Sequence, residues 1–158
     1  MFIRALFAFL ILPGLAAFVA PPLLARIDPW SDEIFAPGAA LMLIGSIWLL
    51  WCVRDFYVAG KGTLAPWDPP KKLVVVGLYR RVRNPMYVGV LTLVAGWALL
   101  LTSPLLATYT GILAIGFHLR VITYEEPWLA EQFGDSWYRY RAGVRRWWPR
   151  LKPWKAQP

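Results

Sequence analysis

Charged and hydroxyl-bearing side chains gather where a long apolar stretch of the chain begins. Residues 77–89 read GLYRRVRNPMYVG, and no charged residue follows until Arg120. A surface that faces lipid has no use for such side chains, so they are either topological markers or parts of a site. A second polar cluster, Tyr-Glu-Glu-Pro at residues 124–127, follows the same apolar stretch. The pair of clusters favours a site.

The composition is that of an integral membrane protein. Hydrophobic residues make up 58% of the 158 residues, charged residues only 16%, and the mean hydropathy is +0.47. Residues 5–25 and 34–53 are uncharged, and each is close to the ~20 residues that a spanning helix needs. The uncharged stretch 84–119 is too long for one span and suits a hairpin that turns at residues 102–104. We therefore predict an all-α integral membrane protein with four transmembrane helices, including a C-terminal-half hairpin, and additional cytoplasmic amphipathic helices.

Two features of the first half of the chain have alternative interpretations. Arg4, the apolar run and the small residues near Ala17 also resemble a secretory signal. We prefer a span, because the rest of the chain is membrane-embedded in any case. The single cysteine, Cys52, excludes an internal disulfide framework and a cysteine zinc site, and we expect it to have a packing role.

The distribution of charge predicts the orientation in the membrane. Residues 54–83 hold seven basic and two acidic residues, and the tail from Arg120 holds eight basic and four acidic ones. Residues 26–33 reverse this pattern, with three acidic residues and one arginine. The positive-inside rule then puts both termini, the long loop and the tail in the cytoplasm. Topology and attraction to anionic lipid explain most of the net charge of +8.

We treat residues 1–158 as a single membrane domain. It consists of the first two spans (1–58), a cytoplasmic loop (59–85), the helical hairpin (86–122) and a tail with amphipathic helices (123–158). Prolines and glycines at 60–70 rule out a helix or strand there, and the central tryptophan favours a loop folded over the helix ends. Residues 73–76 should be extended. Pro127 should end or kink the preceding helix and open a new one, and 134–136 should form a turn before a further helix start.

The hairpin has one decisive geometric consequence. Its two free ends must return to the same membrane face, which brings residues 83–87 near Arg120, Tyr124, Glu125 and Glu126 although about forty residues separate them. A helix dipole and solvent could by themselves stabilise the two glutamates. At a bilayer boundary, however, carboxylates need partners, and Arg83 and Arg120 supply them. Such a cluster can bind a zwitterionic small molecule, with arginine on a carboxylate and glutamate on an ammonium or a ribose diol.

Other familiar sites are missing from the sequence. The only histidine, His118, is more simply a buried, hydrogen-bonded residue than a ligand, and one histidine without clustered cysteines gives no recognisable metal site. No glycine-rich phosphate loop follows a strand, and no serine sits on a hydrolase-type turn. The aromatic and cationic tail (137–150) suits nucleic acid, but beside four spans it suits headgroup anchoring better. We therefore expect no nucleic-acid partner, and one tail arginine could turn inward.

Six motifs in order carry a family resemblance: Gly77-x-Tyr79, Val82-Arg-Asn-Pro-Met-Tyr-x-Gly89, Tyr124-Glu-Glu-Pro127, Phe133-Gly134, Tyr138-x-Tyr140 and Arg146-x-x-Pro149. Over about residues 60–150 the chain resembles the membrane methyltransferases of the isoprenylcysteine carboxyl methyltransferase and phospholipid N-methyltransferase superfamily. The resemblance implies S-adenosylmethionine as cofactor, S-adenosylhomocysteine as product, and a lipid-accessible opening. It also implies the positions that hold the cofactor, namely Lys71, Lys72, Leu73, Val74, Tyr79, Asn84, Pro85, Met86, Tyr87 and Glu125. Arg83 and Glu126 flank these positions and would support them.

Two departures concern the acceptor. The prenylcysteine branch usually has histidine where Asn84 stands, and its acidic motif is not followed by a proline such as Pro127. Both resemble the phospholipid or general bacterial branch, which implies a bacterial inner membrane and a phospholipid amine or other lipid as acceptor. An isoprenylcysteine-type carboxyl acceptor is the alternative. For a carboxylate acceptor Arg120 would orient the substrate, and for an amine Glu126 would be a candidate base.

Methyl transfer from a sulfonium is an in-line displacement, so positioning supplies much of the rate and no covalent enzyme intermediate is required. A non-catalytic membrane protein whose basic face binds anionic lipid or a partner is the alternative from another class. In that protein lysine could replace arginine without loss, whereas a bidentate arginine site would suffer. The sequence leaves open the oligomeric state and whether nitrogen, oxygen or sulfur is methylated.

Overall fold

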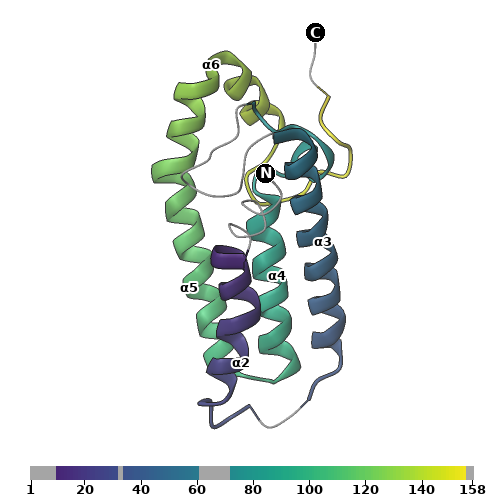
Figure 1. The fold of residues 1–158 in the computed structure, drawn as a ribbon, viewed down its shortest axis with the longest axis vertical. Coiled ribbons are helices and arrows are strands. Elements are labelled where there is room, and N and C mark those ends of the chain that lie inside the picture. The colour runs from purple at the N-terminus through teal and green to yellow at the C-terminus, as the bar shows by residue number, and fades with distance from the viewer. Residues whose placement is uncertain (1–9, 32–33, 61–71, 156–158) are drawn as a thin grey trace.

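The computed structural model describes residues 10–31, 34–60 and 72–155 (Figure 1). Every regular element in these ranges is helical, which confirms the all-α prediction. Of the loop predicted at 60–70, Gly60 is instead the last residue of a helix, and 61–70 lie outside the described residues, as does Lys71. The predicted extended segment 73–76 has no helix, and Val76 has an extended backbone with φ −131° and ψ 162°.

Long helices side by side form the body of the molecule (Figure 1). Helix α4 (Pro85–Leu100) lies between α3 (Pro37–Gly60) and α5 (Pro104–Arg120) and contacts both. The first helical segment, η1 (Leu10–Val19) followed by α2 (Ala20–Ala25), packs against α4 and α5. Ala17, Leu49, Val90, Leu93 and Val94 are buried together and form the core of this bundle.

Two of the described helices are long and apolar enough to cross a membrane. One comprises Pro37–Asp55, and the other begins at Pro104. The apolar helices Gly14–Ala25 and Pro85–Leu100 are shorter. At 1.5 Å per residue, α4 extends about 24 Å, which is less than the ~30 Å of a typical hydrocarbon core. Two helices thus have the length and composition of a membrane span, and the number of spans stays a prediction.

Glycines let α3 and α4 approach backbone to backbone. A Cβ atom on Gly45 would lie 2.6 Å from the backbone nitrogen of Leu93, and one on Gly96 would lie 2.7 Å from that of Met42. Small residues at helix contacts are a common way to pack helices within lipid. Gly45 is buried at this contact.

The hairpin turns at residues 102–104, where the sequence predicted it. Thr102 has a φ of +45°, and the Ser103 side chain caps α5 by accepting a hydrogen bond from the backbone N–H of Leu106 at 3.1 Å. Asp28, buried between the first helix and this turn, accepts hydrogen bonds from the Ser103 hydroxyl and from the N–H of Leu105. These contacts fix the turn at the end of the bundle opposite the polar motifs.

Helix α5 continues into the tail without a break. A wide π turn, η3 (Val121–Glu125), links it to α6 (Glu126–Gly143). The turn ends two residues before Pro127. In a regular α-helix the proline ring would clash with the carbonyl group four residues earlier, and the wider π turn avoids this clash. The new helix predicted at Pro127 is α6, which begins at Glu126 with Pro127 in its first turn, and the π turn joins it to α5.

Helix α6 then changes direction at Gly134, where φ is +48° and ψ is −126°. This agrees with the predicted turn at residues 134–136. The second half of α6 folds back, so that Trp137, Tyr140 and Val144 form a buried cluster against Leu73 and Val75, among others. The kink therefore brings the tail back onto residues 73–76, which precede residues 77–89, the segment that we term the basic motif.

Candidate functional site at the polar end of the hairpin

The structure brings Tyr87, at the start of α4, together with Arg120 and Glu125, at the end of α5. The Tyr87 hydroxyl donates a short hydrogen bond to Glu125 Oε1. Arg120 Nε donates to the same carboxylate oxygen at 2.9 Å and to the Tyr87 oxygen at 3.2 Å. The side chains of Arg120 and Glu125 remain 40% and 26% exposed, so this half of the site is open to a ligand.

Glu126 turns the other way and is buried between two arginines. Arg146 donates to both of its carboxylate oxygens, from Nε at 2.6 Å and from Nη2 at 2.9 Å. Arg83 Nη1 lies 3.1 Å from Oε1 on the other side. Burial raises the pKa of Glu126, but the hydrogen bonds from Arg146 and the charge of Arg83 outweigh burial, and the pKa is lowered below its usual value. Glu126 is therefore ionised at neutral pH.

The Arg83 guanidinium has hydrogen-bond donors to spare. Its side chain is 8% exposed and lies over the ring of Trp137, 5.4 Å from the ring centroid. Nη1 is close to Glu126 without the alignment that a hydrogen bond requires, and no described residue accepts a hydrogen bond from Nε or Nη1. Burial lowers the pKa of Arg83, partly offset by Glu126. A buried cation with unused donors fits an anionic group of a ligand.

The segment Val144–Trp154, which we term the C-terminal strap, runs along the basic motif. Its backbone accepts a hydrogen bond from Arg83 N at Arg145 O (2.9 Å) and donates one from Arg150 N to Arg81 O (2.8 Å). The Trp154 N–H donates to Arg80 O at 2.7 Å. The strap thereby places Arg146 beside Glu126, which answers the expectation that one tail arginine turns inward.

Asp55, at the end of α3, positions the start of the basic motif. Its Oδ2 accepts a hydrogen bond from the N–H of Leu78 at 3.2 Å, in the short helix η2 (Gly77–Arg80). Gly77 has a φ of +48°, and a Cβ atom there would lie 1.7 Å from Oδ2. Only glycine fits both this backbone and this contact. Tyr79 follows in η2, and its carbonyl accepts a hydrogen bond from the buried Tyr140 hydroxyl at 2.6 Å.

Aromatic rings line the open half of the site. Tyr87 stacks on Phe117 with ring centroids 4.4 Å apart, and Trp147 of the strap lies 6.5 Å from Tyr87. The Trp147 indole N–H donates to His118 Nδ1 at 3.2 Å. The expectation of a buried histidine is wrong: His118 is exposed, because it projects from α5 toward the strap and not into the bundle, although it is hydrogen-bonded.

The structure places the remaining predicted residues around these groups. Asn84 Nδ2 donates to Arg146 O at 3.3 Å, and Pro85 O accepts from the Trp48 indole at 2.8 Å. Met86 is half-buried against the bundle core, Val74 is buried, and Leu73 packs on the cluster around Trp137. Lys72 is exposed. The assignment of Lys72, Leu73 and Val74 to the cofactor rests on the resemblance alone.

Sequence reasoning missed the roles of Asp55 and Trp147, and it named Arg146 in a family motif without pairing it with Glu126. Asp55 ends an apolar span beside Arg54, and an acidic residue at that position is a signal that could have been followed. The motif does not give the partner of Arg146, because that partner depends on how the strap folds back.

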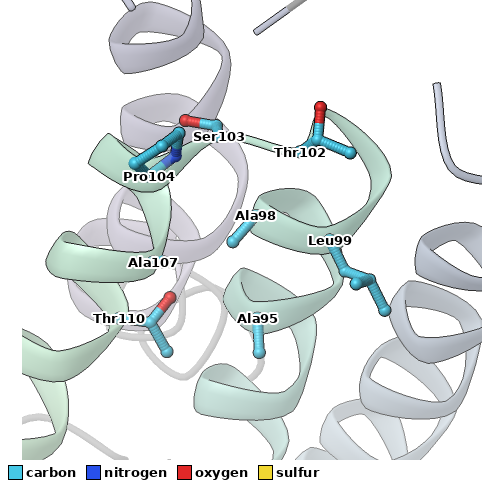
Figure 2. A pocket seen from close by; sticks show the side chains of 8 residues that line it. All are labelled: Ala95, Ala98, Leu99, Thr102, Ser103, Pro104, Ala107 and Thr110. Carbon is cyan, nitrogen blue, oxygen red and sulfur yellow. The ribbon is translucent and has the colours of Figure 1, made fainter. Parts of the chain in front are cut away.

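A groove of about 440 Å³ lies at the other end of the hairpin, between α4 and α5 (Figure 2). Small side chains such as Ala95, Ala98 and Ala107 line it, together with the turn residues. Tyr87 and Arg120 are at the opposite ends of the same helices, so the groove is separate from the candidate site.

Residues 34–136 of the chain match the phospholipid methyltransferase family. No curated protein and no solved structure matches the chain significantly. The family match spans α3, both hairpin helices and the acidic motif, and it ends just beyond the Gly134 kink. Since the match covers well over half of the sequence, the chain belongs to the phospholipid methyltransferase family.

Proposed function

We propose that the protein transfers a methyl group from S-adenosylmethionine to a lipophilic acceptor that reaches the site from the bilayer, and that this acceptor is a phospholipid amine. The observation that carries the proposal is the joining of the two motifs. Arg83 and Tyr87 lie at the start of the first hairpin helix, and Glu125 and Glu126 lie just after the second. At the open end of the hairpin these residues form one polar cluster. Family membership supports the reaction class.

The residues present fit the cofactor. S-adenosylmethionine supplies an electrophilic methyl group on a sulfonium, and it also carries a carboxylate, an ammonium and a ribose diol. The unused donors of Arg83 suit the carboxylate. The exposed side of Glu125 suits the ammonium or the diol, while Tyr87 and Arg120 hold that carboxylate in place. Three arginines face two glutamates here, so one positive charge is left to pair with an anionic group.

The chain's own contribution to the reaction is the orientation of the donor and the acceptor. A nucleophile must approach opposite the sulfonium, so rigid placement of the donor and acceptor supplies much of the rate. Arg120 is the half-exposed cation at the edge of the site, and we assign it to orient the acceptor's phosphate or carboxylate. The sequence suggested Glu126 as a base for an amine acceptor. Its two arginines lower the pKa of Glu126 and make it a weak proton acceptor, so we favour a positioning role, holding Arg83 and Arg146. The lipid ammonium would then lose its proton to water at the open half of the site before the amine attacks the methyl group.

We further propose four spans, in which the first helix and α4 cross alongside α3 and α5. Both termini and the polar cluster then face the cytoplasm, because the basic loop and tail belong on that side. Short spans of the length of α4 can be tolerated by local thinning of the bilayer and by side chains that reach the interface. The cofactor would enter from water at this end and the acceptor from the lipid beside α5.

The direct test is methyl transfer in vitro. The purified protein in bilayer nanodiscs containing phosphatidylethanolamine should transfer deuterated methyl groups from S-adenosylmethionine to the lipid amine, as seen by mass spectrometry. Glu125→Gln should abolish the product. The control is Glu131→Gln, an exposed carboxylate on α6 whose loss should leave the rate unchanged.

The outcomes separate the alternatives. If a lipid carboxyl group or another lipid is labelled in place of the amine, the protein is still a methyltransferase, but the proposed acceptor is wrong. If no lipid is labelled and Arg120→Lys preserves lipid binding, the protein is a non-catalytic binder of anionic lipid, and the proposal is wrong.

A further inference from the structure

The C-terminal strap presents large apolar side chains to its surroundings. Trp148 is 75% exposed and Leu151 is 94% exposed. Neighbouring strap residues point the other way: Arg146 pairs with Glu126, and Trp147 contacts His118. The strap therefore has an inner face, which belongs to the candidate site, and an outer face formed by Trp148 and Leu151.

The outer face does not arise from a loosely held chain end. Arg150 N donates to Arg81 O on one side of Leu151, and Trp154 N donates to Arg80 O beyond it. The Arg81 guanidinium donates to the carbonyls of Arg150 and Leu151 at 3.2 and 2.5 Å. An ordered segment that holds a tryptophan and a leucine in water exposes apolar area with no local compensation. Such a pair marks an interaction surface.

The charge around the outer face identifies the partner. Residues 136–158 contain seven basic residues (Arg139, Arg141, Arg145, Arg146, Arg150, Lys152 and Lys155) and no acidic residue. Arg145, Lys152 and Lys155 are exposed and lie within four residues of Trp148 or Leu151 in the sequence. Tryptophan with flanking basic residues is the combination that inserts at the headgroup level of an anionic membrane. An acidic protein surface would attract the charges but would not require an exposed leucine and tryptophan.

The position in the fold agrees with this partner. The strap lies at the end of the bundle where α3 ends and α4 begins (Figure 1). A helix that crosses the bilayer ends at its interface, so the strap is at the level of the headgroups.

We infer that the outer face of the strap docks on an anionic bilayer surface, with Trp148 and Leu151 inserted at the headgroup level and Arg145, Lys152 and Lys155 on the lipid phosphates. This goes beyond the proposed function, because it concerns a surface outside the catalytic cluster.

Site-directed spin labelling tests the inference without an activity assay. Cys52 is buried, so a nitroxide on Leu151→Cys labels the strap selectively. In nanodiscs with 30% phosphatidylglycerol the label should become accessible to oxygen and shielded from a water-soluble nickel complex. In purely zwitterionic nanodiscs it should be shielded less. A label on Ile112→Cys, 63% exposed on α5, gives the reference for lipid contact in both bilayers.

A charge variant makes the test specific. Combining Arg145→Gln, Lys152→Gln and Lys155→Gln removes exposed charges and leaves the site residues intact. Each basic residue near an anionic surface raises the binding constant about fivefold. The triple variant should therefore lower the equilibrium constant for insertion of the strap about a hundredfold. The inference is overturned if the label stays in water in both bilayers, or if the triple variant inserts as deeply as the unmodified strap. Either result leaves the proposed methyl transfer untouched.

Discussion

Arg146 and Glu126 form a two-point ion pair across the fold-back of α6, with both carboxylate oxygens engaged at 2.6 and 2.9 Å. The pair links the strap to the acidic motif and holds the carboxylate against Arg83. Glu126 is 8% exposed and Arg146 is 26% exposed, so neither charge is fully screened by water. The integrity of the site therefore depends on a residue outside the span of the family match.

The first prediction concerns this ion pair. Lysine at position 146 keeps the charge and loses the parallel donors, so Arg146→Lys should lower the free energy of unfolding by about 1–3 kcal/mol. Thermal unfolding in detergent measures the loss. Arg145→Lys is the control, because its side chain is exposed, and it should unfold like the original protein. Equal stability of the two variants would show that the pair contributes nothing.

The second prediction concerns the contact between Asp55 and Gly77. Alanine at position 77 would combine a strained φ of +48° with an overlap on the Asp55 carboxylate, so Gly77→Ala should destabilise the protein by at least about 2 kcal/mol. Gly111→Ala is the control: a Cβ atom there meets nothing within 4 Å, and alanine in a helix should be neutral or stabilising by up to about 1 kcal/mol. If Gly77→Ala has the same melting temperature as the original protein, the described contact is wrong.

The third prediction concerns the hydroxyl of Tyr87. Tyr87→Phe keeps the ring stacked on Phe117 and removes the group between Arg120 and Glu125. A hydrogen bond to a charged, partly exposed group contributes about 1.4 kcal/mol, so affinity for S-adenosylhomocysteine should fall about tenfold. Tyr138→Phe, on an exposed residue of α6, should leave it unchanged. An unaltered affinity in Tyr87→Phe would remove Tyr87 from the site.

The fourth prediction concerns acid stability. The folded-state pKa of Glu126 is lowered from its ordinary 4.5, so its ion pairs stabilise the fold fully above that value. This stability is lost as the pH falls below about 4.5 and through the folded-state pKa. The melting temperature of Glu126→Gln should therefore decline less steeply between about pH 5 and 3 than that of the original protein. Parallel curves would show that Glu126 titrates normally.

Much of this arrangement could be predicted from the sequence. Helices, the hairpin turn and the kink at Gly134 follow from local signals, namely uncharged runs, proline and glycine. The meeting of Tyr87 with Glu125 follows from the hairpin alone, since the free ends of two antiparallel helices share one face.

The rest depends on contacts between distant segments. Glu126 pairs with Arg146 only because the strap folds back, and the motif that contains Arg146 names no partner for it. The exposure of His118 likewise depends on the side of α5 that the strap covers. Such features are set by tertiary packing, which the periodicity of a single chain does not encode.

Calorimetric titration of S-adenosylhomocysteine into the purified protein in nanodiscs tests the central claim most directly, because binding requires the cluster and not the acceptor. The account predicts binding at one site per chain, lost in Glu125→Gln and Arg83→Gln and retained in Glu131→Gln, with circular dichroism unchanged throughout. Absence of binding to well-folded protein, or equal affinity in all four proteins, would contradict it.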